Sequence, residues 1–228
     1  MSPPKTTIIL VRHADVHNPN DIVYGRLPRF RLSALGEAEA RRTAEALCAA
    51  PPAALYSSPQ LRARQTARII AAQYPGLEIH ITRLLAEVLT SWQGRPNAEM
   101  AVRQFNFYDP LHHPDDESLE DIARRLVRWI ALMLRRHPGA VVAGVSHGDP
   151  LMVVRLLFSG QALTPANLRR PEEYPAKGSI TRLVFEGVGD PTTLPVQVRY
   201  EDPNQAARGG PQGDQRVARA GAVARRES

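Results

Sequence analysis

Two histidines that each follow an apolar run are the residues of this sequence best placed to do chemistry. Arg12 and His13 come directly after the run from Ile8 to Val11, which has the composition of a short buried strand. His147 comes after a second run of this kind, from Val141 to Ser146. Open α/β sheets bind ligands at the edge formed by the carboxyl ends of their parallel strands. An isolated Arg-His pair is often only the polar end of a strand, but the repeated pattern favours a shared site.

Arg62 and Glu87 also follow expected strands, and they complete a set of side chains suited to phosphate chemistry. Two arginines and two histidines around one point make an electropositive pocket, and guanidinium groups bind phosphate oxygens through paired hydrogen bonds. A neutral histidine is a nucleophile towards phosphorus, and nearby arginines disfavour its protonated form. A carboxylic acid such as Glu87 delivers a proton to the leaving oxygen. The combination predicts phosphoryl transfer through a phosphohistidine, without any metal.

Alternating strand and helix patterns predict the elements that must position these residues. Strands are expected at 8–11, 53–57, 77–81, 141–146, 179–185 and 196–200, and helices at 33–50, 58–70, 118–136 and 150–158. This alternation predicts an α/β fold, a three-layer sandwich with a mainly parallel central sheet and helices on both faces. We expect it to form one domain over residues 1–200, with the polar residues that follow its strands meeting at one edge.

Two segments lack such a pattern. The insertion from about 92 to 116 is predicted to be a small lid, in which Phe105, Phe107 and Tyr108 lie over or beside the pocket rather than in the main core. Residues 201–228 have no periodicity and nearly balanced charges, which is typical of disordered chains. They are therefore predicted to form a disordered tail that is dispensable for the chemistry.

Composition limits the possible partners. The 228 residues carry a net charge of +6, and most of the excess is arginine scattered along the chain. Scattered arginines suit a small phosphorylated substrate, whereas a nucleic-acid partner would call for a basic block. Cys48 is the only cysteine, so a disulfide framework is excluded. A signal-peptide pattern and an apolar run of roughly 20 residues are both missing, which predicts a cytoplasmic protein without a membrane partner. The oligomeric state is not predicted.

Five motifs resemble those of the histidine phosphatase superfamily, the phosphoglycerate-mutase-like group, and occur in the same order. They are Leu10-Val11-Arg12-His13, similar to L-V-R-H-G-E-T; Leu32 to Ala40, similar to L-T-x-x-G-x-x-Q-A; Tyr56 to Ala67, similar to Y-S-S-x-L-x-R-A-x-Q-T-A with one extra residue; Leu85-Ala86-Glu87, similar to L-x-E; and Val145-Ser146-His147-Gly148, similar to V-S-H-G. The resemblance covers residues 7 to about 187. It implies a histidine acid phosphatase-like phosphomonoesterase that uses no cofactor.

The resemblance also implies a role for each residue of the set. His13 would accept the phosphoryl group, while Arg12, Arg62 and His147 would hold its oxygens. Glu87 would first protonate the leaving group and then activate water. Taken singly, Arg62 could be an exposed helix residue, Glu87 a helix-face carboxylate and His147 a satisfied strand-end histidine. As an ordered set they favour function, with His13, Glu87 and His147 catalytic.

The sequence departs from the family pattern directly after His13. Ala14 stands where the family has glycine, and Val16 replaces a residue with a hydroxyl group, so both changes could alter how phosphate approaches. The Trp-Asn pair that glycolytic mutases carry shortly after the first motif is missing, which favours a phosphatase over a mutase. A phosphoglycerate mutase-type transferase and a catalytically weak member that only binds phosphorylated ligands are the alternatives.

A metal-dependent hydrolase is a third alternative. It would use His13 with His17, or His112 with His113. His13 and His17 have helical spacing, but Pro19 opposes a helix there, and no glutamate follows His13 as a zincin motif requires. Adjacent histidines in a Pro-rich loop lie more often on the surface. We therefore predict that no metal is bound.

Overall fold

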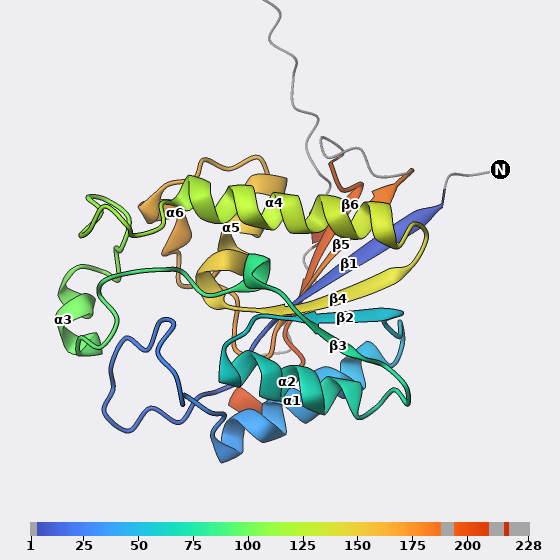
Figure 1. Ribbon diagram of the computed structural model, residues 1–228, viewed down its shortest axis with the longest axis horizontal. Helices are drawn as coiled ribbons and strands as arrows, with labels where there is room; N and C mark the ends of the chain where they lie inside the picture. The colour runs from blue at the N-terminus through green and yellow to red at the C-terminus, as the bar shows by residue number, and fades with distance from the viewer. Residues whose placement is uncertain (1–3, 188–193, 210–216, 219–228) are drawn as a thin grey trace, which may run out of the picture.

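A central sheet between two layers of helices makes up the protein (Figure 1). The computed structural model describes residues 4–187, 194–209 and 217–218. The strands are β1 (Lys5–Arg12), β2 (Ala54–Ser57), β3 (Ile79–Ile81), β4 (Val141–Ser146), β5 (Ile180–Glu186), β6 (Gln197–Glu201) and β7 (Val217–Ala218). The helices are α1 (Ala34–Leu47), α2 (Leu61–Ala71), α3 (Asn97–Val102), α4 (Leu119–Arg136), α5 (Gly148–Phe158) and α6 (Pro165–Leu168), with short 3₁₀ helices η1 (Arg83–Leu85) and η2 (Ala206–Arg208).

The strand order β3-β2-β4-β1-β5-β6-β7 places β1 and β4 next to each other at the centre of the sheet. These two strands are parallel, and Arg12 pairs with Ser146 at their carboxyl ends. His13 and His147 each follow a residue of that last pair, so both rings start from the same edge. The predicted α/β sandwich is confirmed. Its sheet is mixed, because β1 to β4 run parallel while β5, β6 and β7 pair antiparallel with their neighbours.

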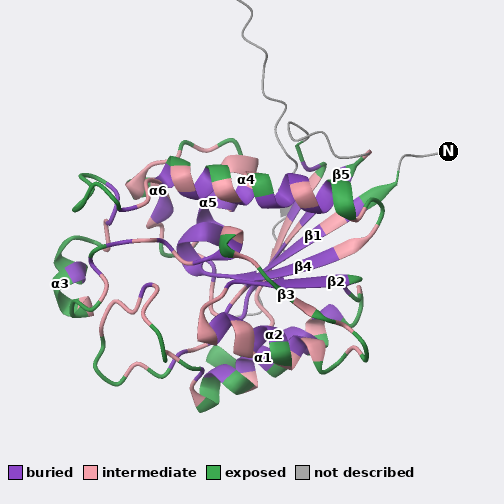
Figure 2. Ribbon diagram, in the orientation of Figure 1, coloured by how far each residue is buried: buried purple, intermediate pink, exposed green. Residues whose placement is uncertain are grey.

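Both faces of the sheet are buried, which explains why β1 is apolar at consecutive positions rather than at alternate ones. Ile8 and Leu10 point to the face covered by α4 and α5, where they join the larger hydrophobic cluster. Ile9 and Val11 point to the face covered by α1 and α2. Figure 2 shows the central strands as buried along most of their length. The strands that carry the candidate residues are therefore held from both sides.

Serine caps fix the starts of the helices on either side. Ser33 Oγ accepts a hydrogen bond from Gly36 N at the start of α1. Ser118 and Asp121 form a capping box at the start of α4. Both starts agree with the predictions from the sequence. Across the described part of the chain, the structure contains no helix that is both long and apolar enough to cross a membrane.

The insertion is less separate from the core than its sequence indicates. Phe107 and Tyr108 are buried in the larger hydrophobic cluster, and Phe105 is partly buried against it. The prediction that these aromatics lie outside the main core is therefore wrong for Phe107 and Tyr108. The side-chain oxygen of Asn106 accepts hydrogen bonds from the backbone N–H groups of Tyr108 and Asp109 and turns the chain inward. The aromatic rings are therefore placed by a turn that the Asn106 side chain stabilises, and not by a regular spacing of apolar residues.

The segment predicted as a tail is ordered at its beginning, so this prediction is wrong for residues 201–209. Asn204 is fully buried and accepts a hydrogen bond from Arg42 Nε at 2.7 Å. Arg208 Nη2 forms an ion pair of 2.6 Å with Glu39 on α1. Polar contacts with α1 therefore order a segment that has too few apolar residues to form a core of its own. Residues 210–216 and 219–228 lie outside the described residues.

Replacing Asn204 with alanine is expected to lower the melting temperature by roughly 3–8 °C, because Arg42 loses a buried acceptor. The matched control is Ala207→Ser, an exposed position in the short helix η2 that follows Asn204. Thermal unfolding followed by circular dichroism measures both variants. A loss no larger than that of the control would show that residues 201–209 contribute little to stability.

Candidate active site

His13 is held so that one ring nitrogen carries no proton. The side chain is buried, and its Nδ1 lies 2.8 Å from the carbonyl oxygen of Ala14. A carbonyl only accepts hydrogen bonds, so Nδ1 carries the proton and Nε2 keeps its lone pair. Burial, followed by the charges of Arg62 and Arg12, lowers the pKa of His13 well below its usual value. The ring is therefore neutral near pH 7.

Arg62 lies at the centre of the site, and its side chain is completely buried in the first turn of α2. Its Nε donates to His13 Nε2 at 3.0 Å, and its Nη2 lies 2.9 Å from the carbonyl oxygen of Gly25 and 3.1 Å from His147 Nδ1. The ring of Tyr24 lies 4.6 Å from the guanidinium. Arg62 Nη1 is buried without an acceptor among the described residues. A buried guanidinium with an unmatched N–H group suits an oxyanion.

His147 lies on the other side of the same point. Its ring centroid is 5.0 Å from that of His13, and its Nε2 lies 2.6 Å from Ser58 Oγ. Because Arg62 Nη2 donates to Nδ1, the proton of the neutral ring is on Nε2 and bonds to Ser58. Burial and the charge of Arg62 lower the pKa of His147 well below its usual value. The serine therefore sets the ring orientation, and Nδ1 faces the centre of the site.

Glu87 follows the short helix η1 and brings a carboxyl group to this centre. Its Oε1 accepts the N–H group of Val88 at 2.9 Å. Its Oε2 lies 3.3 Å from His147 Nδ1 and 3.4 Å from Arg62 Nη2. Burial raises the pKa of Glu87 despite the opposing charge of Arg62. A carboxyl group in this state can serve as a proton donor.

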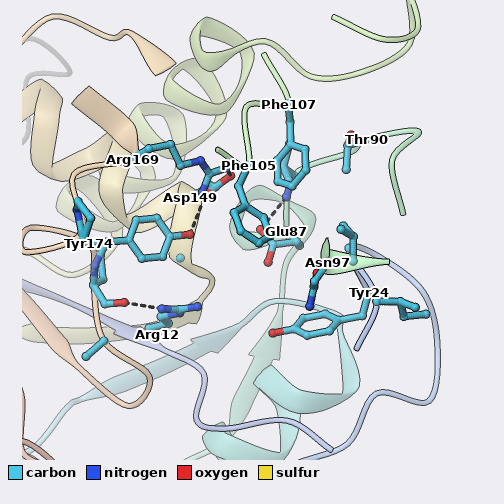
Figure 3. A pocket seen from close by; sticks show the side chains of 18 residues that line it. Arg12, Tyr24, Glu87, Thr90, Asn97, Phe105, Phe107, Asp149, Arg169 and Tyr174 are labelled. Atoms are coloured by element: carbon cyan, nitrogen blue, oxygen red, sulfur yellow. Dashed lines mark hydrogen bonds and ion pairs between the residues drawn. The ribbon is translucent and has the colours of Figure 1, made fainter. Parts of the chain in front are cut away.

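Arg12 forms the side of the site that faces solvent. Its Nη1 donates to the carbonyl oxygen of Pro175 at 2.5 Å, and its guanidinium lies 5.1 Å from the centre of the Tyr174 ring. Its Nε is buried without an acceptor among the described residues. Arg12 and Glu87 both line a cavity of about 610 Å³ (Figure 3). The structure therefore brings all five predicted residues to one point: Arg12, His13, Arg62, Glu87 and His147.

The two departures from the family motif are accommodated within the core. Ala14 packs with Leu32 and Ala40 in a small apolar cluster, and it does not line the cavity. Its backbone is not in the left-handed region that would require glycine. Val16 is buried and pairs with Leu32 through a backbone bridge. Neither side chain lines the cavity of the site.

The sequence profile of the Histidine phosphatase superfamily (branch 1) matches residues 8–194. The chain belongs to this superfamily. A curated relative in Mycobacterium tuberculosis, "Uncharacterized protein Rv0525", is 35% identical over 191 residues, which cover 81% of this chain and 93% of the relative.

Solved structures of the superfamily share the fold. A mycobacterial glucosyl-3-phosphoglycerate phosphatase is 23% identical, with a TM-score of 0.70 over 87% of this chain and 98% of that chain. YhfR of Bacillus stearothermophilus is 26% identical, with a TM-score of 0.70 over 83% of this chain and 95% of that chain. At these levels of identity the structural likeness supports the architecture and does not assign a substrate.

Sequence reasoning missed a second polar cluster in this histidine phosphatase superfamily member. Asp149 follows Gly148 in the first turn of α5 and is buried. It accepts hydrogen bonds from Tyr108 and Tyr174 at 2.5 Å, and from both Nη atoms of Arg169 at 2.8 Å. The position of Asp149, two residues after His147, was a signal in the sequence that this carboxylate lies near the site. Arg169 and Tyr174 lie in a loop without any pattern, so nothing in the sequence connected them to the site.

The metal alternative is not supported by the geometry of the site. The histidines His17, His112 and His113 are exposed, and His112 stacks on Trp92 with ring centroids 4.2 Å apart. Side-chain atoms of His13, Glu87 and His147 do lie within 4.8 Å of one another, as metal ligands could. However, the guanidinium of Arg62 already contacts all three. A buried positive charge at that point disfavours a divalent cation and favours an anion.

Proposed function

We propose that this protein is a metal-independent phosphomonoester hydrolase that acts through a phosphohistidine on His13. The observation that carries the proposal is the hydrogen bond from His13 Nδ1 to the Ala14 carbonyl, which leaves Nε2 unprotonated beneath two arginines. Membership of the superfamily, among whose structural neighbours are phosphatases, supports the same conclusion. The substrate is then a small phosphorylated molecule in the cavity that Arg12 and Glu87 line.

In the first step, the Nε2 lone pair attacks phosphorus while the bond from phosphorus to the ester oxygen breaks. Arg12 and Arg62 are positioned to hold the phosphoryl oxygens, because their unmatched N–H groups gain acceptors. His147 Nδ1, which carries no proton in the neutral ring, accepts a hydrogen bond from the protonated oxygen of the ester monoanion. Arg62 Nε, which donates to His13 Nε2 in the free protein, turns to the phosphoryl group instead. Glu87 gives its proton to the departing oxygen, so the product leaves as an alcohol.

In the second step, water attacks the phosphohistidine and the bond between phosphorus and Nε2 breaks. Glu87, now ionised, takes a proton from the water, and inorganic phosphate leaves. His13 is again neutral with its proton on Nδ1, and Glu87 is again protonated. Each group has returned to its starting state, so the cycle needs no metal and no second substrate.

The experiment that tests the proposal is to trap the covalent intermediate. A reaction with a chromogenic phosphomonoester, quenched in alkali within milliseconds in the presence of a chelator, is expected to yield protein phosphorylated on His13 by mass spectrometry. A burst of alcohol equal to the enzyme concentration should accompany it if hydrolysis of the intermediate is slower. Phosphate binding without any phosphoenzyme would indicate a ligand-binding protein. Transfer to a second substrate with little free phosphate would indicate a mutase.

The pKa directions predict an acidic optimum for phosphoenzyme formation. Reactive His13 must be neutral, and its lowered pKa keeps it so below pH 6.5. Glu87 must be protonated, so the rate falls as pH rises through its raised pKa. With phenyl phosphate, Glu87→Gln is expected to slow this step by roughly 10²–10⁴-fold. The decrease in rate that ionisation of Glu87 causes at higher pH should also disappear in this variant.

A good leaving group provides the matched control for this assignment. The nitrophenolate of para-nitrophenyl phosphate departs without a proton, so Glu87→Gln should phosphorylate His13 from this ester at nearly the native rate. Stopped-flow measurements with both esters from pH 4 to pH 9 separate the two cases. An equal loss with both esters would show that Glu87 positions the substrate and is not the acid.

A further inference from the structure

The part of the cavity that would receive the esterified group of a substrate is mostly carbon. Val23, Tyr24, Phe105, Phe107 and Pro171 contribute to its wall, and Figure 3 shows the aromatic rings arranged around the cavity. Its volume of about 610 Å³ exceeds what a phosphate group alone would occupy, and pockets of this size hold small organic ligands. The leaving group of an ester must lie next to Glu87, which lines the same cavity.

The charges on that wall are already paired with each other. Arg169 meets Asp149 through two hydrogen bonds of 2.8 Å, and the hydroxyl groups of Tyr108 and Tyr174 occupy the remaining acceptor positions of the carboxylate. The guanidinium of Arg169 also lies 5.1 Å from the ring of Phe107. This cluster joins the insertion, α5 and the loop before β5 into one wall. Its net charge is zero.

One donor of the cluster remains unused. Arg169 Nε is buried without an acceptor among the described residues. Since Asp149 neutralises the guanidinium, this position suits an uncharged acceptor such as a carbonyl or ether oxygen better than a second anion. Thr90 and Asn97, which also line the cavity, are likewise uncharged.

A second anionic group on a substrate within this cavity would find no uncommitted cation among the described lining residues. Among the described residues that line the cavity, the charged ones are Arg12, Glu87, Asp149 and Arg169. Arg12, with Arg62 beneath it, is needed for the phosphoryl group, and Arg169 is bound to Asp149. A carboxylate attached to the ester would lose its hydration against apolar side chains, close to Asp149.

Building on the hydrolase function proposed above, we propose that the substrates are phosphomonoesters of apolar or aromatic alcohols that carry no second anionic group. The aromatic wall binds the alcohol part, and the closed pair of Asp149 and Arg169 excludes carboxylates and second phosphates. This specificity also separates the protein from enzymes that act on phosphoglycerates, whose carboxylate lies only a few bonds from the phosphate.

Three phosphate esters of related phenols test, on the native protein, whether a second anionic group on the substrate is excluded. Phenyl phosphate, para-carbamoylphenyl phosphate and para-carboxyphenyl phosphate differ mainly in the group at the far end of the ring. We expect similar kcat/KM for the first two, and a value for the carboxylate roughly 10–200-fold lower that arises in KM. Phosphoglycerate should be poorer still. Measuring His13 phosphorylation with each ester in the same experiment reports on the hydrolase mechanism separately.

Two variants locate the source of the preference. Phe105→Ala should raise KM for phenyl phosphate by about 10-fold or more, whereas Val102→Ala, an exposed neighbour at the end of α3, should leave it unchanged. Asp149→Asn frees the charge of Arg169, so the ratio of kcat/KM for the carboxylate ester to that for the carbamoyl ester should rise by about 10-fold or more. The ratio cancels any general loss of activity in this variant.

The outcomes separate the two proposals. If the phosphoenzyme forms and the carboxylate ester or phosphoglycerate is turned over as well as phenyl phosphate, the specificity inference is wrong while the hydrolase function stands. An unchanged substrate ratio in Asp149→Asn would also contradict it. If no ester phosphorylates His13, both proposals fall. Should Asp149→Asn not fold, the native protein and Phe105→Ala still decide the question.

Discussion

Replacing His13 with alanine is expected to abolish phosphoenzyme formation and to reduce phosphomonoester hydrolysis by roughly 10⁴-fold or more. The variant loses the buried ring nitrogen whose lone pair is directed into the site by the hydrogen bond between Nδ1 and the Ala14 carbonyl. Arg12, Arg62 and His147 remain, so phosphate should still bind. Steady-state kinetics, isothermal titration with inorganic phosphate and mass spectrometry after alkaline quench measure the three properties.

His147→Ala is the comparison that distinguishes the two histidines. Its Nε2 proton is committed to Ser58 and its unprotonated Nδ1 faces the centre of the site, so we assign it a role in binding the protonated oxygen of the phosphoryl group. Turnover should fall by about 10²–10³-fold, with a trace of phosphoenzyme still detectable. Phosphate mapped to His147 in the native protein, or substantial turnover by His13→Ala, would overturn the mechanism.

Replacing Arg62 with alanine is the second change with a large expected effect. The guanidinium contacts His13, Glu87 and His147, and it carries a buried N–H group that awaits an acceptor. Its loss should lower kcat/KM by roughly 10³-fold and weaken phosphate binding, because a positioned donor is removed from the transferring group. It should also raise the pKa of His13, since the charge of Arg62 is among the causes that lower it.

Arg68→Ala on the same helix is the matched control, because its side chain is exposed and far from the site along α2. Arg62→Lys keeps the charge but loses the planar set of donors, and we expect it to recover only a small part of the activity. Circular dichroism establishes whether each variant is folded. Activity of Arg62→Ala close to that of the Arg68 control would mean that Arg12 alone is sufficient to hold the phosphoryl group.

Three members of the candidate set could be predicted because each is marked by a local pattern. Arg12, His13 and His147 end apolar runs, and the parallel pairing of β1 with β4 follows from the α/β alternation that places such ends together. Arg62 and Glu87 needed the family motifs, because an arginine on a helix and a glutamate after a short apolar stretch are ordinary surface patterns. In the structure the side chain of Arg62 is completely buried, and that of Glu87 is 13% exposed.

The walls of the site could not be predicted in the same way. Asp149, Arg169 and Tyr108 come from three separate elements, and their contacts are made by polar groups that have no period along the chain. Asn204 and Arg208 show the same limit at the other end of the sequence. Periodicity reports which face of an element is buried in apolar surroundings, and it says nothing about which charged groups will find each other across the fold.

The two histidines and the walls of the cavity are held by different parts of the fold. This separation affects how substrate specificity can diverge. His13 and His147 come directly after two central strands that are paired in fixed register and covered on both faces. Phe105 and Arg169 stand on irregular segments that contribute no strand to the sheet. Substitutions in those segments can accumulate without moving the ring nitrogen of His13. If the proposed chemistry holds, descendants of one ancestral gene can therefore acquire different alcohols as substrates while inheriting the same phosphoryl transfer.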